Sequence, residues 1–183
     1  PRNGDVLALV STPAFAIDQF TGNIDRAAWL SIVQDPQHPL LNRVSQAQYP
    51  PGSVFKIILM AAGLQEGSIT PMDKVHCSGE FHFGDRTWRD WKTDGHGTVD
   101  LRRGIARSCD VYFYTQGLKI GGATIAKYAK MFGFAAATGF ELGTEKFGLI
   151  PEPKLRRDKK ARPWSGGDTL NMSFIGTGCV NFL

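Results

Sequence analysis

Ser53 and Lys56 are the two residues whose types and spacing most directly suggest chemistry. They stand three positions apart in Ser53-Val54-Phe55-Lys56, and residues at this spacing on a helix lie on the same face. A serine hydroxyl is too weakly acidic to supply much alkoxide near neutral pH, so a serine nucleophile needs a base to take its proton. A lysine amine can take it when burial favours the neutral form. The pair predicts a lysine-activated serine, although a serine N-cap before an ordinary helix gives the same pattern.

The residues around this pair predict a helix that positions both side chains. Pro50-Pro51-Gly52 stands immediately before the serine, and this order suits an extended approach followed by a tight turn into a helix. Residues 57–62 are all apolar, so we expect the helix from Ser53 to Leu64 to be buried within a core. The partial positive charge at its N-terminus would favour negative charge developing on the serine oxygen.

A second group of residues has the chemistry of a metal site. Cys77, Asp90, His96 and Cys109 supply two thiols, a carboxylate and an imidazole within one short segment, a donor set that favours zinc over magnesium or calcium. Four protein ligands leave no open position, so the expected metal is structural and does not activate water. Two alternatives remain open, a Cys77–Cys109 disulfide in an oxidising compartment and two buried free thiols. The substitute ligands are His76 and His82.

Composition narrows the class of protein. The chain has 183 residues, 42% hydrophobic content and a net charge of +4, enough for one domain with a sizeable core. The net positive charge is compatible with weak attraction to anionic cell-wall polymers or lipid headgroups. The lack of a long block of like charges argues against nucleic-acid binding. No apolar run reaches the length of a membrane span, and no signal peptide precedes Pro1. Three tryptophans either line a groove or lie buried, namely Trp88, Trp91 and Trp164.

The pattern along the chain predicts a helix-rich α/β arrangement. The apolar run Asp5–Val10 is typical of a central strand. A short helix is expected within residues 23–37, and residues 134–163 have mainly loop character because glycine and proline punctuate them. The remaining helices are predicted at residues 53–64, 101–107, 111–120 and 124–132, the last of them ending at Gly133.

Several of these motifs together resemble a known family. The stretch from Asn42-Arg43 through Tyr49-Pro50-Pro51-Gly52 to Lys56 is similar to the active-site segment of penicillin-binding proteins, in which serine-x-x-lysine carries the nucleophile. Ser108-Cys109-Asp110 resembles the second motif of that family, serine-x-asparagine or serine-x-aspartate. The similarity continues in order along the chain, at residues 4–11, 90–92, 95–97 and 166–169. The sequence most resembles the class B, elongation-type members, which are peptidoglycan D,D-transpeptidases.

The resemblance implies a fold and a mechanism. The fold would be the helix-rich part of the serine β-lactamase/D,D-transpeptidase fold. Ser53 would attack the carbonyl between the two terminal D-alanines of a stem peptide with Lys56 as general base, while Ser108 relays a proton to the leaving amine and Asp110 orders the network. An amine of a neighbouring stem peptide would then resolve the acyl-enzyme and make the cross-link. β-Lactams would acylate the same serine, and the acyl transfer itself needs no cofactor.

One part of the family pattern is missing. Members carry a third motif, lysine-threonine/serine-glycine, after the second motif. Two segments partly match it. Residues 92–95 contain an extra residue and precede Ser108, and residues 176–178 lack the lysine. We therefore expect residues 1–183 to be a partial transpeptidase domain, inactive when isolated, whose membrane anchor, non-catalytic module and third motif lie outside the sequence.

The resemblance also implies a location and partners. The location would be the bacterial cytoplasmic membrane, with the catalytic part on the periplasmic side. Expected partners are peptidoglycan stem peptides, β-lactam antibiotics, a SEDS-family membrane glycan polymerase and other elongation-complex proteins. A β-lactamase, a β-lactam sensor and a catalytically inactive structural partner are the alternatives.

Overall fold

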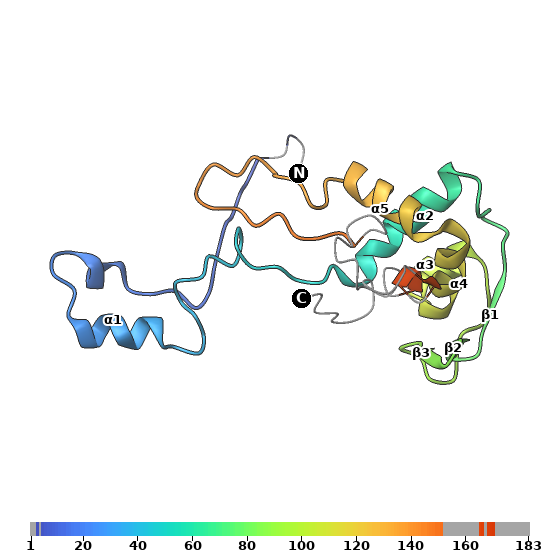
Figure 1. Ribbon diagram of the computed structural model, residues 1–183, viewed down its shortest axis with the longest axis horizontal. Coiled ribbons are helices and arrows are strands. Elements are labelled where there is room, and N and C mark those ends of the chain that lie inside the picture. Colours follow the sequence, from blue (N-terminus) through green and yellow to red (C-terminus); the bar gives the residue numbers. More distant parts are fainter. Residues whose placement is uncertain (1–2, 4, 152–164, 167, 171–183) are drawn as a thin grey trace. The chain divides into compact units, whose positions relative to one another are not determined.

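The computed structural model describes residues 3, 5–151, 165–166 and 168–170, and these fall into two compact units (Figure 1). The first unit comprises Pro1–Tyr49 and Ala137–Phe147, and the second comprises Pro50–Ala136 and Gly148–Leu183. Among the described residues, no helix combines the length and the apolar character needed to cross a membrane.

The first unit contains one 3-10 helix, η1 (Ile17–Phe20), and one α-helix, α1 (Arg26–Val33), in its described part. Helix α1 begins at Asp25, whose carboxylate accepts hydrogen bonds from the backbone N–H groups of Ala27 and Ala28 at 3.1 and 3.2 Å. Such a cap satisfies N–H groups that have no partner within the helix. The short helix expected within residues 23–37 is thereby confirmed.

The strand predicted at Asp5–Val10 is wrong for the described structure. The segment has no strand geometry, and Val6 and Leu7 are 71% and 83% exposed. An apolar run forms a strand only where a second backbone pairs with it, and no described segment does so here.

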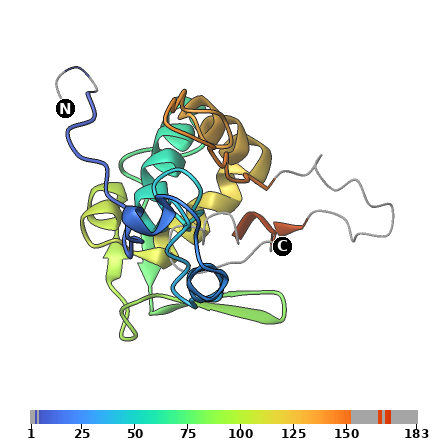
Figure 2. The ribbon, with the colours of Figure 1, turned by 90° about the vertical axis from the view of Figure 1, so that its left-hand side faces the viewer.

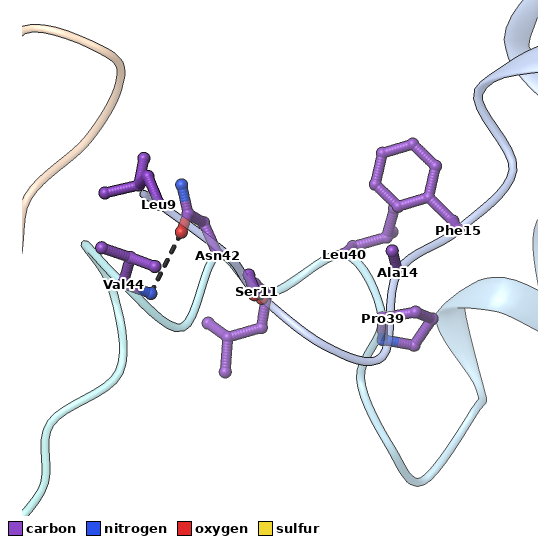
Figure 3. A pocket seen from close by; sticks show the side chains of 9 residues that line it. Leu9, Ser11, Ala14, Phe15, Pro39, Leu40, Asn42 and Val44 are labelled. Atoms are coloured by element: carbon purple, nitrogen blue, oxygen red, sulfur yellow. Dashed lines mark hydrogen bonds between the residues drawn. The ribbon is translucent and has the colours of Figure 1, made fainter. Parts of the chain in front are cut away.

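A hollow of about 240 Å³ lies within the first unit (Figure 3). Most of its lining side chains are apolar. The Ser11 hydroxyl bonds to the Leu41 carbonyl, and the Asn42 side-chain oxygen accepts from the Val44 N–H. None of the predicted site residues lines it. The lining consists of Leu9, Ser11, Ala14, Phe15, Pro39, Leu40, Leu41, Asn42 and Val44.

The second unit contains the predicted helices, with ends that differ by a few residues from those expected. The nucleophile segment is a 3-10 turn, η2 (Gly52–Phe55), that runs directly into α2 (Lys56–Gln65). Helices α3 (Leu101–Ala106), α4 (Asp110–Ile120) and α5 (Gly122–Met131) follow. Helix α2 packs against both α4 and α5, as Figures 1 and 2 show.

The core of this unit lies between α2, α4 and α5. Phe55, Leu59, Phe113 and Ile125 are at most 1% exposed and belong to one contiguous apolar cluster. The expectation that α2 is buried on every side is wrong at Ile57, which is 50% exposed. Since a helix turns by about 100° per residue, a segment that is apolar throughout still presents one side to whatever lies outside the core.

Helices α2 and α5 are also joined at the surface. Glu66, just after α2, accepts hydrogen bonds from the Lys127 amine at 2.7 Å and the Tyr128 hydroxyl at 3.0 Å. The hydrogen bond from Lys127, followed by that from Tyr128, holds the pKa of the Glu66 carboxyl below its usual value.

In the described part of the second unit, four short strands form two antiparallel pairs. Strand β1 (Val75–Cys77) pairs with β4 (Gly97–Val99), and β2 (Glu80–Phe83) pairs with β3 (Arg86–Arg89) as a hairpin. The β1–β4 register places Cys77 opposite Gly97. This pairing brings Cys77 close to the loop that carries His96.

Candidate active site and metal centre

The nucleophile candidate and its lysine lie at the junction of η2 and α2. Ser53 is exposed, whereas Lys56 is only 2% exposed. Gly52 has φ +64°, a conformation that favours glycine, and it turns the chain into the helix just before the serine. Phe55 and Leu59, both buried, hold this end of α2 in the core.

The second motif places Ser108 between these two residues. The Ser108 hydroxyl lies 2.8 Å from the Ser53 Oγ, and the Lys56 Nζ lies 3.0 Å from the Ser108 Oγ and 2.9 Å from the Ser108 carbonyl oxygen. Within the described part of the chain, the hydrogen-bond partners of Lys56 are Ser108 and Asp110, and Ser53 is not among them. Among the described residues, the hydrogen-bonded connection between Ser53 and Lys56 therefore runs through Ser108.

Asp110 is the buried counter-charge of Lys56. Its Oδ1 accepts a hydrogen bond from the Lys56 amine, and its Oδ2 accepts one from the backbone N–H of Trp91 at 3.2 Å. Burial raises the pKa of the Asp110 carboxyl, and the Lys56 amine only partly counteracts this effect. The Phe113 ring, 5.6 Å from the Lys56 Nζ, adds a cation–π contact.

The four predicted metal ligands come together in the second unit. One donor atom from each of Cys77, Asp90, His96 and Cys109 lies within 4.8 Å of the others. Each cysteine Sγ is 3.4 Å from the Asp90 Oδ2, and the His96 Nδ1 is 3.7 Å from the Cys77 Sγ and 3.4 Å from the Asp90 Oδ1. Both thiols and the carboxylate are buried, and the His96 side chain is 3% exposed.

The donor separations are near those of a tetrahedral zinc shell. With usual zinc bond lengths, the edges of such a shell measure about 3.3–3.6 Å between unlike sulfur, nitrogen and oxygen donors. Four separations, measured to one or the other Asp90 oxygen, are 3.4–3.7 Å, and the whole set lies within 4.8 Å. The donor set therefore suits a zinc ion, and the ligands would draw slightly together to close around it.

Asp90 also links this cluster to the second motif. Its Oδ2 accepts hydrogen bonds from the backbone N–H groups of Asp110 and Val111, at 2.8 and 3.1 Å, and so caps the start of α4. Burial would raise the pKa of the Asp90 carboxyl, but hydrogen bonds from the Lys92 and Val111 N–H groups outweigh it and hold the pKa below its usual value. Burial, reinforced by the Asp90 charge, raises the pKa of the Cys109 thiol.

The two cysteines and the two substitute histidines of this segment lie in different surroundings. Cys77 and Cys109 are free thiols, so the alternative, a disulfide between them, is not formed. His76 is exposed on β1, and His82 bonds to Thr87 and Glu80 in the β2–β3 hairpin. Neither histidine belongs to the cluster.

Trp88 and Trp91 differ in their exposure to solvent. Trp88 is 8% exposed and packs in a small hydrophobic cluster, while Trp91 is 65% exposed. Trp164 lies outside the described residues, as do residues 176–178 and Cys179. Residues 92–95 form a loop in which the Lys92 amine bonds to the Gly95 carbonyl at 2.7 Å.

Comparison with known proteins gives the family of this chain. The sequence profile described as "Penicillin binding protein transpeptidase domain" matches residues 1–175. The chain belongs to this transpeptidase family. The resemblance noted in the sequence is thereby confirmed, and so is the transpeptidase-like fold.

Individual members of the transpeptidase family are similar over nearly the whole chain. The peptidoglycan D,D-transpeptidase MrdA of Acinetobacter baumannii is 37% identical over 97% of this chain, which spans 27% of that relative. The structure of Pseudomonas aeruginosa PBP2 in complex with WCK 5153 matches 96% of this chain and 40% of that one, with TM-score 0.86 and 34% identity. A complex between PBP2 and MreC from Helicobacter pylori matches 92% of this chain and 32% of that one, with TM-score 0.85 and 35% identity.

Sequence reasoning named the residues of this site but missed two relations among them. The predicted Ser53–Lys56 pair is connected through the Ser108 hydroxyl, and Asp90 has a second role as the cap of α4. Trp91 was identified only as a groove or core residue, yet it bonds to Asp110. The Asp90-Trp91 dipeptide was the available signal, since it directly precedes the loop that carries His96.

Proposed function

We propose that this chain carries the nucleophile and the second motif of a peptidoglycan D,D-transpeptidase that acts in cell elongation. The observation that supports the proposal is the hydrogen-bonded chain from Ser53 through Ser108 to Lys56, with separations of 2.8 and 3.0 Å. Membership of the transpeptidase family supports the choice of acyl transfer over other serine chemistry.

The proposed acylation follows this hydrogen-bonded chain. In the resting protein Lys56 is paired with Asp110, and the reactive form is the one in which its amine has given up its proton. That amine takes the proton of the Ser108 hydroxyl as Ser108 takes that of Ser53, and the Ser53 oxygen bonds to the carbonyl carbon of the penultimate D-alanine. The bond from that carbon to the nitrogen of the terminal D-alanine breaks, and the proton returns through Ser108 to the departing amine. The Ser53 backbone N–H, at the start of the helix, is the proposed oxyanion donor on this chain.

An amine from a second stem peptide then attacks the acyl-enzyme carbonyl. The bond from that carbon to the Ser53 oxygen breaks, and the proton lost by the amine passes to the Ser53 oxygen. In the proposal, Asp110 keeps Lys56 directed toward Ser108 through its buried contact with the amine. A β-lactam reacts at the same serine because its strained amide takes the place of the donor peptide.

The proposed setting is the extracytoplasmic side of the bacterial cytoplasmic membrane. Penicillin-binding protein 2 of Helicobacter pylori forms a complex with MreC, and this supports an elongation-complex partner of the MreC type here. A SEDS-family glycan polymerase is the further partner that we propose.

Cross-linking by the intact natural protein that carries this chain would test the proposed function. Incubation with uncross-linked peptidoglycan strands is expected to release D-alanine and to yield linked stem peptides, both detected by mass spectrometry. Ser53→Ala is expected to abolish both products, while Ser31→Ala on the exposed face of α1 leaves them unchanged. Hydrolysed stem peptides or hydrolysed β-lactam without any cross-link would contradict a transpeptidase and favour the β-lactamase alternative.

We also propose that Cys77, Asp90, His96 and Cys109 hold a structural zinc ion. The support is their donor chemistry, their burial and separations near those of a tetrahedral shell. Because Asp90 caps α4, a metal at this position would brace the helix that begins with the second motif. The ion takes no part in the proposed acyl transfer.

Metal content gives a direct test of the zinc proposal. The intact protein purified without added chelator is expected to contain about one zinc per chain by atomic emission, since four protein ligands form one closed site. Cys77→Ser is expected to lower that content and the melting temperature together, because metal binding contributes to folding. His82→Ala, at an exposed histidine outside the cluster, is the matched control and should keep the metal. A protein that neither contains zinc nor gains stability when zinc is added would overturn the proposal.

A further inference from the structure

Trp91 combines high exposure with a full set of hydrogen bonds. It is 65% exposed. Its indole Nε1 nevertheless donates to the Arg107 carbonyl at 3.1 Å, and its backbone N–H donates to the Asp110 Oδ2 at 3.2 Å. The two acceptors lie on either side of Ser108 in the sequence.

Ser108 needs such support because its backbone conformation is unfavourable. Its φ is +51°, in the left-handed region that residues with a side chain rarely occupy unless their surroundings hold them there. The Ser108 N–H donates to the Ile105 carbonyl at 3.0 Å, and its own carbonyl accepts from Lys56. The indole bond to Arg107 fixes the carbonyl of the peptide unit that leads into Ser108.

The indole ring is itself held in place. It meets the His96 ring edge to face, with centroids 5.3 Å apart, and His96 is anchored by the Asp90 carboxylate at 3.4 Å. Exposure of the ring means that it adds little to the core, so its contribution to folding stability is small. Trp91 therefore packs little against the core, while its indole N–H is bonded to the Arg107 carbonyl beside Ser108. These features fit a positioning role better than a packing role.

We propose that Trp91 is a positioning residue that holds the Ser108 hydroxyl between Ser53 and Lys56 during acyl transfer. The inference rests on the proposed function, because it assigns a role within that reaction. Without the indole N–H, the peptide between Arg107 and Ser108 keeps only its N–H bond to the Ile105 carbonyl and can tilt. The Ser108 oxygen then shifts from its positions 2.8 Å from Ser53 and 3.0 Å from Lys56. Proton transfer slows, while reversible binding of the acyl donor is unaffected.

The test is the rate of acylation of the intact natural protein by a fluorescent penicillin, measured over a range of concentrations. Trp91→Phe keeps an aromatic ring and removes the N–H donor. It is expected to lower the limiting acylation rate constant by about three- to tenfold, the equivalent of one hydrogen bond. The half-saturating concentration and the melting temperature are expected to stay unchanged. Trp29→Phe, at a tryptophan of 40% exposure in the first unit, is the matched control and should react like the wild type.

A double-mutant cycle with Ser108→Ala separates positioning from a structural effect. If Trp91 acts through the Ser108 hydroxyl, Trp91→Phe has no further effect on the acylation rate of Ser108→Ala. An equal loss in both backgrounds, or a change confined to the half-saturating concentration, overturns the inference. A wild type that forms no adduct overturns the proposed function and this inference with it. A wild type that reacts normally beside an unchanged Trp91→Phe overturns this inference alone.

Discussion

Replacing Asp110 with asparagine removes the negative charge that faces Lys56 while keeping nearly the same side-chain shape. The Lys56 and Asp110 side chains are 2% and 6% exposed, so the lysine charge cannot be solvated in place of its partner. Loss of one partner from a buried pair costs about 3–5 kcal/mol. Part of this cost is recovered, because burial raises the pKa of Asp110 and so already opposes its ionisation. We expect a net loss near the lower limit, about 3 kcal/mol.

Urea unfolding of the intact protein at neutral pH measures this loss. With a urea dependence of about 1–3 kcal/mol per M, a loss of about 3 kcal/mol lowers the urea midpoint by about 1–3 M. The control is Asp73→Asn, since the Asp73 side chain is 27% exposed and its contact with Lys119 is 3.4 Å long. This change is expected to cost less than about 1 kcal/mol.

The double variant Lys56→Met/Asp110→Asn distinguishes charge burial from a simple loss of packing. Neutral groups at both positions leave no uncompensated charge, so most of the stability lost in Asp110→Asn should return. A loss in Asp110→Asn below about 1 kcal/mol, with an unchanged dependence on urea, would refute the reasoning that Lys56 is a buried charge held by Asp110.

Three further changes test the framework that carries the site. Gly95→Ala should destabilise the protein by at least about 2 kcal/mol, because φ is +73° and an added Cβ would lie 2.2 Å from the Cys77 carbonyl oxygen. Gly84→Ala is the control and should cost less, since the space around its Cβ position is open. Equal losses of melting temperature in the two variants would contradict the predicted clash at Gly95. Leu59→Ala, at a fully buried position, should cost about 2–5 kcal/mol in urea unfolding, and a near-neutral result would place α2 outside the core. The hydrogen bonds from Lys127 and Tyr128 lower the pKa of Glu66. The contribution of Glu66 to folding stability is therefore fully present above the usual glutamate pKa, and it is lost as the pH falls through the lowered pKa. Glu66→Gln should therefore reduce the acid sensitivity of the melting temperature, and an unchanged pH profile would contradict the link.

The helices could be predicted because their signals are local. The Ser53–Leu64 pattern and the segments around residues 101–107, 111–120 and 124–132 carry enough consecutive helical residues to show their period. The strands could not, because β1 and β4 have three residues each and exist through pairing across the chain, as Val75 does with Val99. The error at Asp5–Val10 has the same origin, since an apolar run carries no information about its partner.

The site was predicted as a set of residues but not as a geometry. The spacing of Ser53 and Lys56 and the motif at Ser108 placed all three in one pocket. Whether Ser53 or Ser108 contacts Lys56 depends on the left-handed backbone conformation at Ser108. The local sequence does not predict that conformation. For Cys77 and Asp90, donor chemistry alone selected the cluster, and the long-range β1–β4 pairing brings its parts together. The metal itself stays a prediction.

The central claim, that Ser53 is an acylated nucleophile activated through Ser108, is tested most directly by mapping a penicillin adduct on the intact natural protein. After exposure to a penicillin, peptide mass spectrometry over several hours is expected to find one adduct, on the peptide that contains Ser53. It is expected to be absent from Ser53→Ala and to form more slowly in Ser108→Ala. A folded protein that forms no adduct, or forms it at another residue, would contradict the claim.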